Sequence, residues 1–245
     1  MAKRRLDTLL VERGLAASPE QARAAVMAGQ VRIGSAAALA SKAGFLVEET
    51  AELSLAAGAE YASRGGEKLA HALDVYGLDV AGAVAADIGA STGGFTDCLL
   101  RRGAARVYAV DVGRGQLDYG LRRDERVVVL EGTNARHLKS LPEALDLATI
   151  DVSFISLQLV LPAVGRLLKP DGRILALFKP QFEARRDEVL RKGVIRDPLL
   201  HATLIGRFVA WAKENAYRVH GPVRSPLVGP AGNIEFFFLL KPPPQ

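Results

Sequence analysis

The chain has 245 residues, of which 49% are hydrophobic and 24% are charged. This is enough apolar material for one ordinary domain with a sizeable core plus a small module. The single cysteine, Cys98, excludes an internal disulfide framework and fits a reducing compartment. The formal net charge of +5 favours an anionic partner such as nucleic acid, although many basic proteins bind none.

The N-terminal residues show no pattern of a leader or a membrane anchor. The first five residues are basic, but Asp7 and Glu12 follow at once, so no apolar signal-peptide core develops. Nowhere does the sequence approach about 18 uninterrupted apolar residues, the length that a membrane helix needs. We therefore expect a soluble, cytoplasmic protein.

Residues 1–60 predict a small α+β module. A short amphipathic helix is expected over residues 5–13, because its leucines share one face. A second helix is expected from Ser18, which is a good N-cap and is followed by a proline. Strands are expected at residues 31–34 and 51–55, a linker at 61–66 and a further helix at 67–76.

From residue 83 onward, apolar runs alternate with helical stretches. The expected strands are residues 83–88, 107–110, 127–130, 145–150, 174–178 and 235–240, and the longer helices are 94–102, 156–168 and 197–215. Strands that alternate with helices predict a mainly parallel sheet covered on both faces. The second domain, residues 67–245, is therefore expected to be an α/β, Rossmann-like sheet.

A glycine-rich loop follows the first of these strands and opens a helix. Its sequence, GASTGG at residues 89–94, lets the backbone turn sharply and approach a ligand closely. About 20 residues further on, Asp111 closes the second strand, where a carboxylate can accept hydrogen bonds from a ribose diol. The glycine spacing departs from the G-x-G-x-x-G of dinucleotide sites and matches the first motif of S-adenosylmethionine methyltransferases. A plain tight turn is the alternative, which the following helix, strand and aspartate disfavour.

Six ordered motifs resemble the TlyA family. They are DIGASTGGFT (residues 87–96), DVGRGQL (111–117), TNAR (133–136), DVSFIS (151–156), KPQFE (179–183) and GNIE (232–235). Members of that family, often labelled haemolysin-like, are rRNA cytidine 2′-O-methyltransferases with an FtsJ-type catalytic domain. The first 60 residues resemble the RNA-binding domain of ribosomal small-subunit protein four. The resemblance spans nearly the whole chain.

The resemblance implies a catalytic tetrad of Lys68, Asp151, Lys179 and Glu235. Taken alone, Lys68 near the start of a helix would be an ordinary surface residue. Asp151 and Lys179 each end an apolar strand, which places them at one edge of the sheet. Glu235 begins a strand, and the mostly parallel sheet with an antiparallel last strand that the resemblance implies places it at the same edge. Lys179 is the implied general base. We expect burial and the Lys68 ammonium to lower its pKa, against the opposing charges of Asp151 and Glu235.

S-adenosylmethionine is the implied cofactor, and no metal is expected. Asp111 is expected to bind the ribose hydroxyls, and Asn134 to face the adenine, where many FtsJ-type relatives carry aspartate. The rest of the implied cofactor pocket is Gly89, Ala90, Ser91, Gly93, Gly94 and Phe95.

The expected partner is rRNA or a ribosomal subunit, bound by a monomer without a membrane. Clustered basic side chains give affinity for phosphates, although such a cluster is more often an ordinary solvated surface. The expected RNA-binding residues are Lys3, Arg4, Arg5, Arg13, Arg23 and Arg32 in the first module and Arg64, Arg136, Arg185 and Arg186 in the second domain.

Other functions stay open at this point. A non-catalytic RNA-binding protein would not need the tetrad, and a pore-forming haemolysin would need a membrane-inserting segment. A base N-methyltransferase typically carries an Asn/Asp-Pro-Pro-Tyr-type motif after the fourth strand, where this chain has residues 151–154, DVSF. The large-subunit 23S rRNA is the expected target, because shorter family members look restricted to it, and 16S rRNA stays a second possibility.

Overall fold

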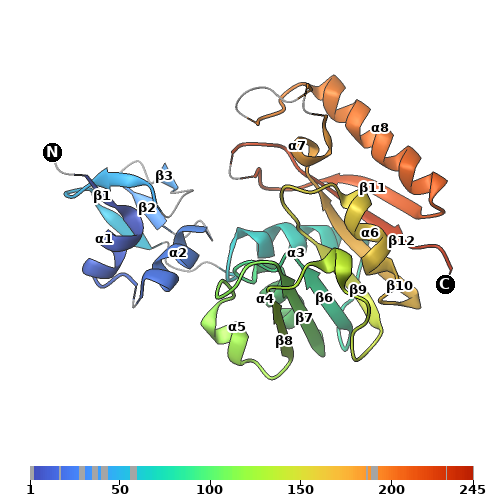
Figure 1. Cartoon of the computed structure of the whole chain (residues 1–245), viewed down its shortest axis with the longest axis horizontal. Helices are drawn as coiled ribbons and strands as arrows, with labels where there is room; N and C mark the ends of the chain where they lie inside the picture. The colour runs from blue at the N-terminus through green and yellow to red at the C-terminus, as the bar shows by residue number, and fades with distance from the viewer. Residues whose placement is uncertain are drawn as a thin grey trace.

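The computed structural model describes residues 3–16, 18–27, 31–34, 38–39, 44–55, 60–185, 187–188, 193–229 and 231–244. A small N-terminal module lies beside a larger α/β domain (Figure 1).

The N-terminal module contains the two expected helices, α1 (Leu6–Glu12) and α2 (Pro19–Met27). The Ser18 hydroxyl accepts a hydrogen bond from the Gln21 amide at 3.2 Å, which confirms the expected cap of α2. Leu6, Leu9 and Leu10 are buried in the core of the module. Its strands are β1 (Lys3–Arg5), β2 (Val31–Ile33), β3 (Ala38–Leu39), β4 (Leu46–Glu48) and β5 (Leu53–Leu55). Three of these, β1, β3 and β4, were not expected.

Helix α3 (Arg64–Tyr76) begins three residues earlier than the sequence predicts. Ser63 is its N-cap and accepts a hydrogen bond from the Gly65 amide at 3.3 Å. A Cβ on Gly66 would lie 2.2 Å from the Tyr61 ring, so this glycine lets the segment pack against the helix. Residues 61–66, expected to form a linker, therefore contain a buried tyrosine, a cap and the first turn of α3.

The larger domain is built on a seven-stranded sheet in the order β11-β12-β10-β9-β6-β7-β8. The strands are β6 (Val84–Ile88), β7 (Arg106–Asp111), β8 (Val127–Glu131), β9 (Leu145–Ile150), β10 (Leu168–Phe178), β11 (Arg218–Arg224) and β12 (Phe236–Lys241). Only β12 runs against its neighbours β10 and β11, so the expected mostly parallel sheet with an antiparallel last strand is confirmed. Strand β11 was not expected, because its mostly exposed residues carry no apolar run.

Helices cover both faces of this sheet. One core cluster joins the sheet to α3 and to α4 (Gly94–Arg101), and the other joins it to α6 (Leu157–Gly165) and α8 (Pro198–Glu214). Along β10, Ile174 and Phe178 belong to the second cluster and Leu175 to the first, as the alternation of a strand requires. Three short elements were not expected: α5 (Tyr119–Arg123), η1 (Ala135–His137) and α7 (Pro180–Glu183). In the described part of the chain, no helix combines the length and apolarity needed to cross a membrane.

Candidate active site

Two lysine–carboxylate pairs lie at the carboxyl edge of the sheet. Lys179 follows β10, and its Nζ is 2.6 Å from Oδ1 of Asp151, which follows β9. Lys68 lies on α3, and its Nζ is 2.6 Å from Oε2 of Glu235, which directly precedes β12. The four side chains line a single hollow, so the structure brings the expected tetrad together.

The strand order explains why these residues meet. Strands β9 and β10 are parallel neighbours and end side by side, whereas the antiparallel β12 begins at that edge with Phe236 opposite Phe178. Gly89 has φ +88° at the end of β6, and a Cβ there would lie 2.5 Å from the Asp151 carbonyl oxygen. The glycine therefore allows the backbone of Asp151 to pack against the end of β6, where its amide donates to the Ile88 carbonyl at 2.8 Å.

Burial and the neighbouring charges shift the pKa of Lys179 in opposite directions. Burial favours the neutral amine, but the charges of Asp151 and Glu235 outweigh it and raise the pKa of Lys179 above its usual value. The expectation of a lowered pKa is therefore wrong for the ligand-free protein, because the two carboxylates together stabilise the ammonium more than burial destabilises it. Lys179 is a protonated cation in this state.

Lys68 is not the ordinary surface residue that its position alone suggests. It is 7% exposed, and Glu235 is 2% exposed. Removing two charges from water is costly, and such a pair adds little to stability compared with apolar side chains of similar volume. A buried pair between residues 167 positions apart is therefore better explained by what it does in the site.

A second hollow of about 490 Å³ adjoins the first and has mainly apolar walls. Asp111 and Asn134 line it, as expected, together with the apolar Val110, Ala135 and Ile155. The two hollows share Gly89, Ser91, Asp151 and Ser153. An apolar chamber with a few polar groups, opening into a charged one, is an arrangement suited to a nucleoside-like ligand with a reactive end.

The Asp111 carboxylate already organises the glycine loop. One of its oxygens accepts a hydrogen bond from the Ser91 amide at 2.8 Å, and the other accepts one from the Gly113 amide at 2.6 Å. Asn134 caps η1, since its carboxamide oxygen accepts a hydrogen bond from the Arg136 amide at 3.0 Å.

Not every glycine of the loop faces a hollow. Gly89, Ala90, Ser91, Gly94 and Phe95 line the charged hollow. Gly93 lines neither. It has φ +94° as the N-cap of α4, and a Cβ there would lie 2.4 Å from a methyl group of Leu121. The structure therefore gives Gly93 a packing role.

The sequence analysis did not single out Asp87, which is fully buried in the charged hollow. Its Oδ2 accepts hydrogen bonds from the Thr96 amide and hydroxyl at 2.9 and 2.8 Å, whereas its Oδ1 has no partner among the described residues. Burial raises the pKa of Asp87 to about 7. An unpartnered buried carboxylate oxygen is costly, so this hollow suits a cationic ligand group. The signal in the sequence was its position at the start of the glycine motif.

Ser153 and Phe154 were also missed, although both lie in the DVSF segment that Asp151 begins. The Ser153 hydroxyl accepts a hydrogen bond from Lys179 Nζ at 3.1 Å. Phe154 has φ +63° and is 92% exposed, and its ring lies 5.0 Å from that of Phe182. An exposed aromatic residue held in a left-handed conformation beside a charged hollow indicates a binding role.

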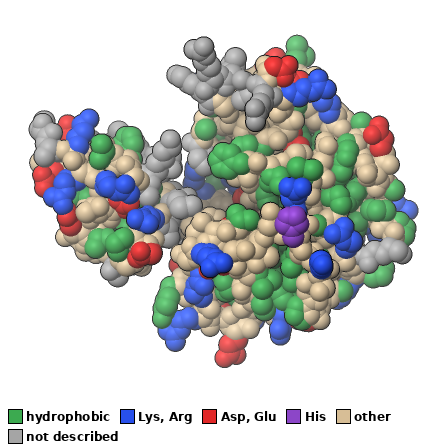
Figure 2. Space-filling view, viewed as in Figure 1, with side chains coloured by type: hydrophobic (Ala, Val, Ile, Leu, Met, Phe, Trp, Pro, Cys, Tyr) green, Lys and Arg blue, Asp and Glu red, His purple; other side chains and the backbone are tan. Residues whose placement is uncertain are grey.

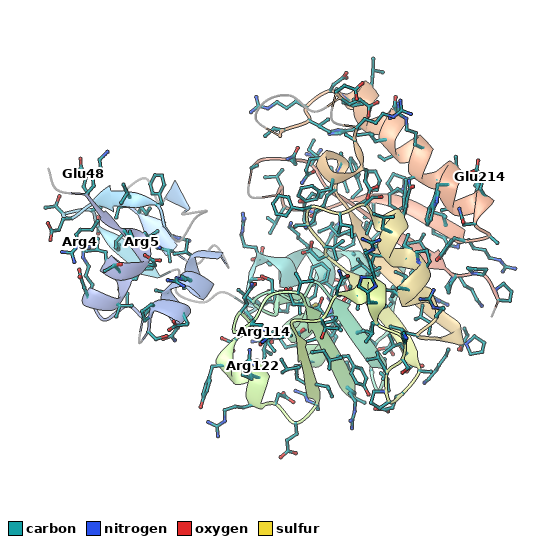
Figure 3. The ribbon with its side chains drawn as sticks, in the orientation of Figure 1. Arg4, Arg5, Glu48, Arg114, Arg122 and Glu214 are labelled. Carbon is teal, nitrogen blue, oxygen red and sulfur yellow. The ribbon has the colours of Figure 1, made fainter. Side chains whose placement is uncertain are left out.

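The expected RNA-binding residues of the N-terminal module differ in their partners. Arg4 pairs with Glu12 and Glu49, and Arg5 pairs with Asp7, as does Arg23 at 3.4 Å. Arg4 and Arg5 are labelled on this module in Figure 3. Figure 2 shows basic and acidic side chains interspersed over the same module, so its surface is not a uniform positive patch.

Those of the remaining expected cations that the structure describes have no ion pair with another described residue. In the module, Lys3 and Arg32 are exposed, and Arg13 donates to the backbone carbonyls of Glu49 and Ala51. In the larger domain, Arg64 lines the charged hollow and Arg136 is exposed on η1. Arg185 follows α7, and Arg186 lies outside the described residues.

Comparisons with known proteins agree with this geometry. Residues 61–241 match the model of the FtsJ-like methyltransferase family, and residues 4–35 match that of the S4 domain. The 16S/23S rRNA (cytidine-2′-O)-methyltransferase TlyA of Mycobacterium tuberculosis is 47% identical over 98% of this chain and 91% of its own length. Hemolysin A of Brachyspira hyodysenteriae is 37% identical over 95% of this chain and 97% of its own. The solved structure of a candidate hemolysin from Streptococcus thermophilus aligns with a TM-score of 0.76 at 42% identity, over 99% of this chain and 89% of that one.

The raised pKa of Asp87 makes a testable prediction about stability. Its proton is bound more tightly in the folded state, so its contribution to stability is present below the unfolded pKa and is lost as the pH rises through about 7. Asp87→Asn cannot titrate and keeps an oxygen for Thr96. The unfolding free energy of the wild type, relative to this variant, should therefore fall by on the order of 4 kcal/mol between about pH 4 and pH 8. Urea unfolding at both pH values measures it. A difference that does not vary with pH would contradict a raised pKa.

Proposed function

Because the chain belongs to the TlyA family of FtsJ-like methyltransferases, we propose that it transfers a methyl group from S-adenosylmethionine to the 2′-hydroxyl of a cytidine in rRNA. The 23S rRNA of the large subunit is the proposed target. The relative from Mycobacterium tuberculosis is named for both 16S and 23S rRNA, so 16S rRNA is the alternative.

The observation that carries this proposal is the meeting of two lysines and two acids in one hollow beside the apolar chamber. A protein that only binds RNA has no need of two lysine–carboxylate pairs at the mouth of a nucleoside-sized chamber. Methyl transfer to a hydroxyl needs a group that removes a proton and a rigid arrangement that aligns the reacting atoms. The tetrad offers both.

The residues present fit S-adenosylmethionine. The chamber of about 490 Å³ falls in the size range of small-molecule sites, and its apolar walls suit an adenine ring. Asp111 would accept hydrogen bonds from the ribose hydroxyls. The unpartnered Oδ1 of Asp87 is a fitting acceptor for the ammonium of the methionine part. When bound, the cofactor supplies a methyl group on a positively charged sulfonium.

Lys179 is the proposed general base. In the ligand-free protein its Nζ forms an ion pair with Asp151 and donates a hydrogen bond to Ser153. Nζ accepts the 2′-hydroxyl proton only after it has lost its own. Positive charge brought near it favours that loss, and so does exclusion of water, whereas Asp151 and Glu235 oppose it. We propose that Lys68 and Glu235 hold the ribose end of the substrate in line.

Phe154 and the N-terminal module support RNA as the substrate. Enzymes that modify a nucleotide within folded RNA take it out of its stack, and aromatic side chains hold unstacked bases. Phe154 lines the apolar chamber and its exposed ring contacts that of Phe182, over which Lys179 Nζ lies at 5.9 Å. We propose that an unstacked base rests on it. We propose residues 1–60 as the RNA-binding domain and residues 67–245 as the catalytic domain. The exposed Lys3 and Arg32 of the first would contact phosphates.

Analysis of the modified nucleoside tests the proposed function. Ribosomal subunits from a strain that lacks the enzyme are incubated with the protein and S-adenosylmethionine, and their rRNA is digested to nucleosides for mass spectrometry. We expect 2′-O-methylcytidine, and mapping assigns it to 23S or 16S rRNA. Methylation on a base, or no methylation of either subunit by folded protein, would refute the proposal.

Replacement of Asp111 tests the cofactor site. Asp111→Ala removes a charged acceptor for the ribose hydroxyls and also releases the Ser91 and Gly113 amides. We expect the affinity for S-adenosylmethionine to fall by at least about 1 kcal/mol, or roughly fivefold, in calorimetry. Asp124→Ala serves as a control, because among the described residues the Asp124 carboxylate bonds only to Arg126. Unchanged affinity in Asp111→Ala would place the ribose elsewhere.

Two substitutions of Lys179 distinguish a role as the base that removes the proton from a role as a positive charge. Lys179→Ala should lose roughly 10² to 10⁴ in the rate of methyl transfer, the usual contribution of a positioned general base. Lys179→Arg should do no better, because the guanidinium keeps its charge but does not deprotonate at working pH. Single-turnover assays with rRNA measure both. Near-normal turnover of the arginine variant would mean that this position supplies positive charge alone.

A further inference from the structure

Glu183 links the two segments that carry the catalytic residues, although it contacts none of the four tetrad side chains in the part of the chain described. It ends α7, the single turn that begins directly after Lys179. Its Oε2 accepts a hydrogen bond from the Ser156 hydroxyl at 2.6 Å, and its Oε1 accepts one from the Leu157 amide at 2.7 Å. Ser156 is the last residue of the 151–156 loop and the N-cap of α6, and Leu157 is the first residue of that helix.

The position of this carboxylate is unusual for a surface turn. Burial raises the pKa of Glu183, against its two hydrogen bonds, which favour the charged form. A buried carboxylate is costly unless it is fully hydrogen-bonded. The N-terminus of α6 supplies an unpaired amide and the positive end of the helix dipole, which together stabilise the negative charge. Glu183 is thus a cap for α6 contributed from another element.

The same two segments also meet at the active site. Lys179 pairs with Asp151 and Ser153 at one end, the Phe154 and Phe182 rings are in contact in the middle, and Glu183 binds Ser156 and Leu157 at the other end. Glu183, Ser156 and Leu157 line neither hollow, whereas Lys179, Asp151 and Phe154 each line at least one. A ligand in either hollow would therefore leave the hydrogen bonds of Glu183 free of competition.

We propose that Glu183 is a positioning residue for methyl transfer, which fixes the 151–156 loop against the turn that carries Lys179. This inference rests on the proposed function for its kinetic consequence. A displacement of about 1 Å in a reacting group can cost 10²-fold in rate, so loosening this link should lower the rate of the chemical step. Glu183 itself lines neither hollow, but residues 151–155 line the apolar chamber, so cofactor affinity should fall much less than the rate.

Three variants and one control test the proposal. Glu183→Ala removes both hydrogen bonds. Ser156→Ala removes one of them, together with the N-cap bond that the Ser156 hydroxyl accepts from the Gln158 amide, and leaves the Leu157 amide bound to Glu183. Glu183→Gln keeps an oxygen for Leu157 and an amide for Ser156. Asp197 caps α8 through the Leu199 amide at 2.9 Å, so Asp197→Ala controls for the loss of a helix cap in the same domain.

We expect Glu183→Ala to lower kcat at least about tenfold, with the dissociation constant for S-adenosylmethionine within about twofold of wild type. The kcat of Ser156→Ala should lie between that of wild type and that of Glu183→Ala. The kcat of Glu183→Gln should lie within about threefold of wild type. Asp197→Ala should keep the wild-type kcat. Wild-type kcat in folded Glu183→Ala, or equal losses in the Gln and Ala variants, would overturn the proposal. If Glu183→Ala does not fold, the Ser156→Ala and Glu183→Gln results decide.

Hydrogen exchange separates this inference from the proposed function. Amide exchange of residues 151–157 in the full chain should quicken in Glu183→Ala and stay slow in Glu183→Gln, whether or not rRNA is the substrate. Unchanged exchange in Glu183→Ala would overturn the positioning role, even with an active wild type. An inactive wild type with quickened exchange in the variant would refute only the proposed function.

Discussion

The ion pair between Lys179 and Asp151 is the interaction on which the site depends. It joins the ends of two parallel neighbours, β9 and β10, and it requires the chain to pass close to the end of β6. Gly89 permits that approach, since any side chain there would collide with the Asp151 carbonyl. The same glycine opens the cofactor loop. One residue therefore couples the geometry of the proposed cofactor chamber to that of the catalytic pair.

The second pair, Lys68 with Glu235, brings in elements from both ends of the domain. Helix α3 lies ahead of the sheet in sequence, and β12 is its last strand. Because β12 is antiparallel, its start lies at the edge where the parallel strands end. A fully parallel sheet would have placed Glu235 at the opposite edge. The antiparallel direction of β12 therefore brings Glu235 to the other three residues of the tetrad.

Much of this arrangement could be predicted from the sequence. Alternating strands and helices predicted the sheet, and apolar strands that end in Asp151 and Lys179 predicted their common edge. The environment of Lys179 could not be predicted, because the direction of its pKa depends on whether a carboxylate 28 residues away lies at 2.6 Å or farther. The roles of Asp87 and Glu183 were hidden for the same reason, because a carboxylate in a motif does not show which groups its oxygens meet in the fold.

Errors at element boundaries had local causes. Gly65 and Gly66 predicted a linker, yet both belong to α3, because a Cβ at Gly66 would collide with Tyr61. The exposed β11 had no apolar run to reveal it, and α7 is a single turn. Each case is a tertiary contact that overrides the local pattern.

The protonation state of Lys179 tests the central claim most directly. Nitrogen NMR of the labelled lysine side chain, followed across pH in the ligand-free protein, reports the pKa of Nζ for the wild type and for Asp151→Asn. The account predicts a wild-type pKa above the ordinary value of about 10.4 and a lower pKa in the variant, which keeps the burial but loses the charge. A wild-type pKa at or below the ordinary value, unchanged by Asp151→Asn, would contradict it.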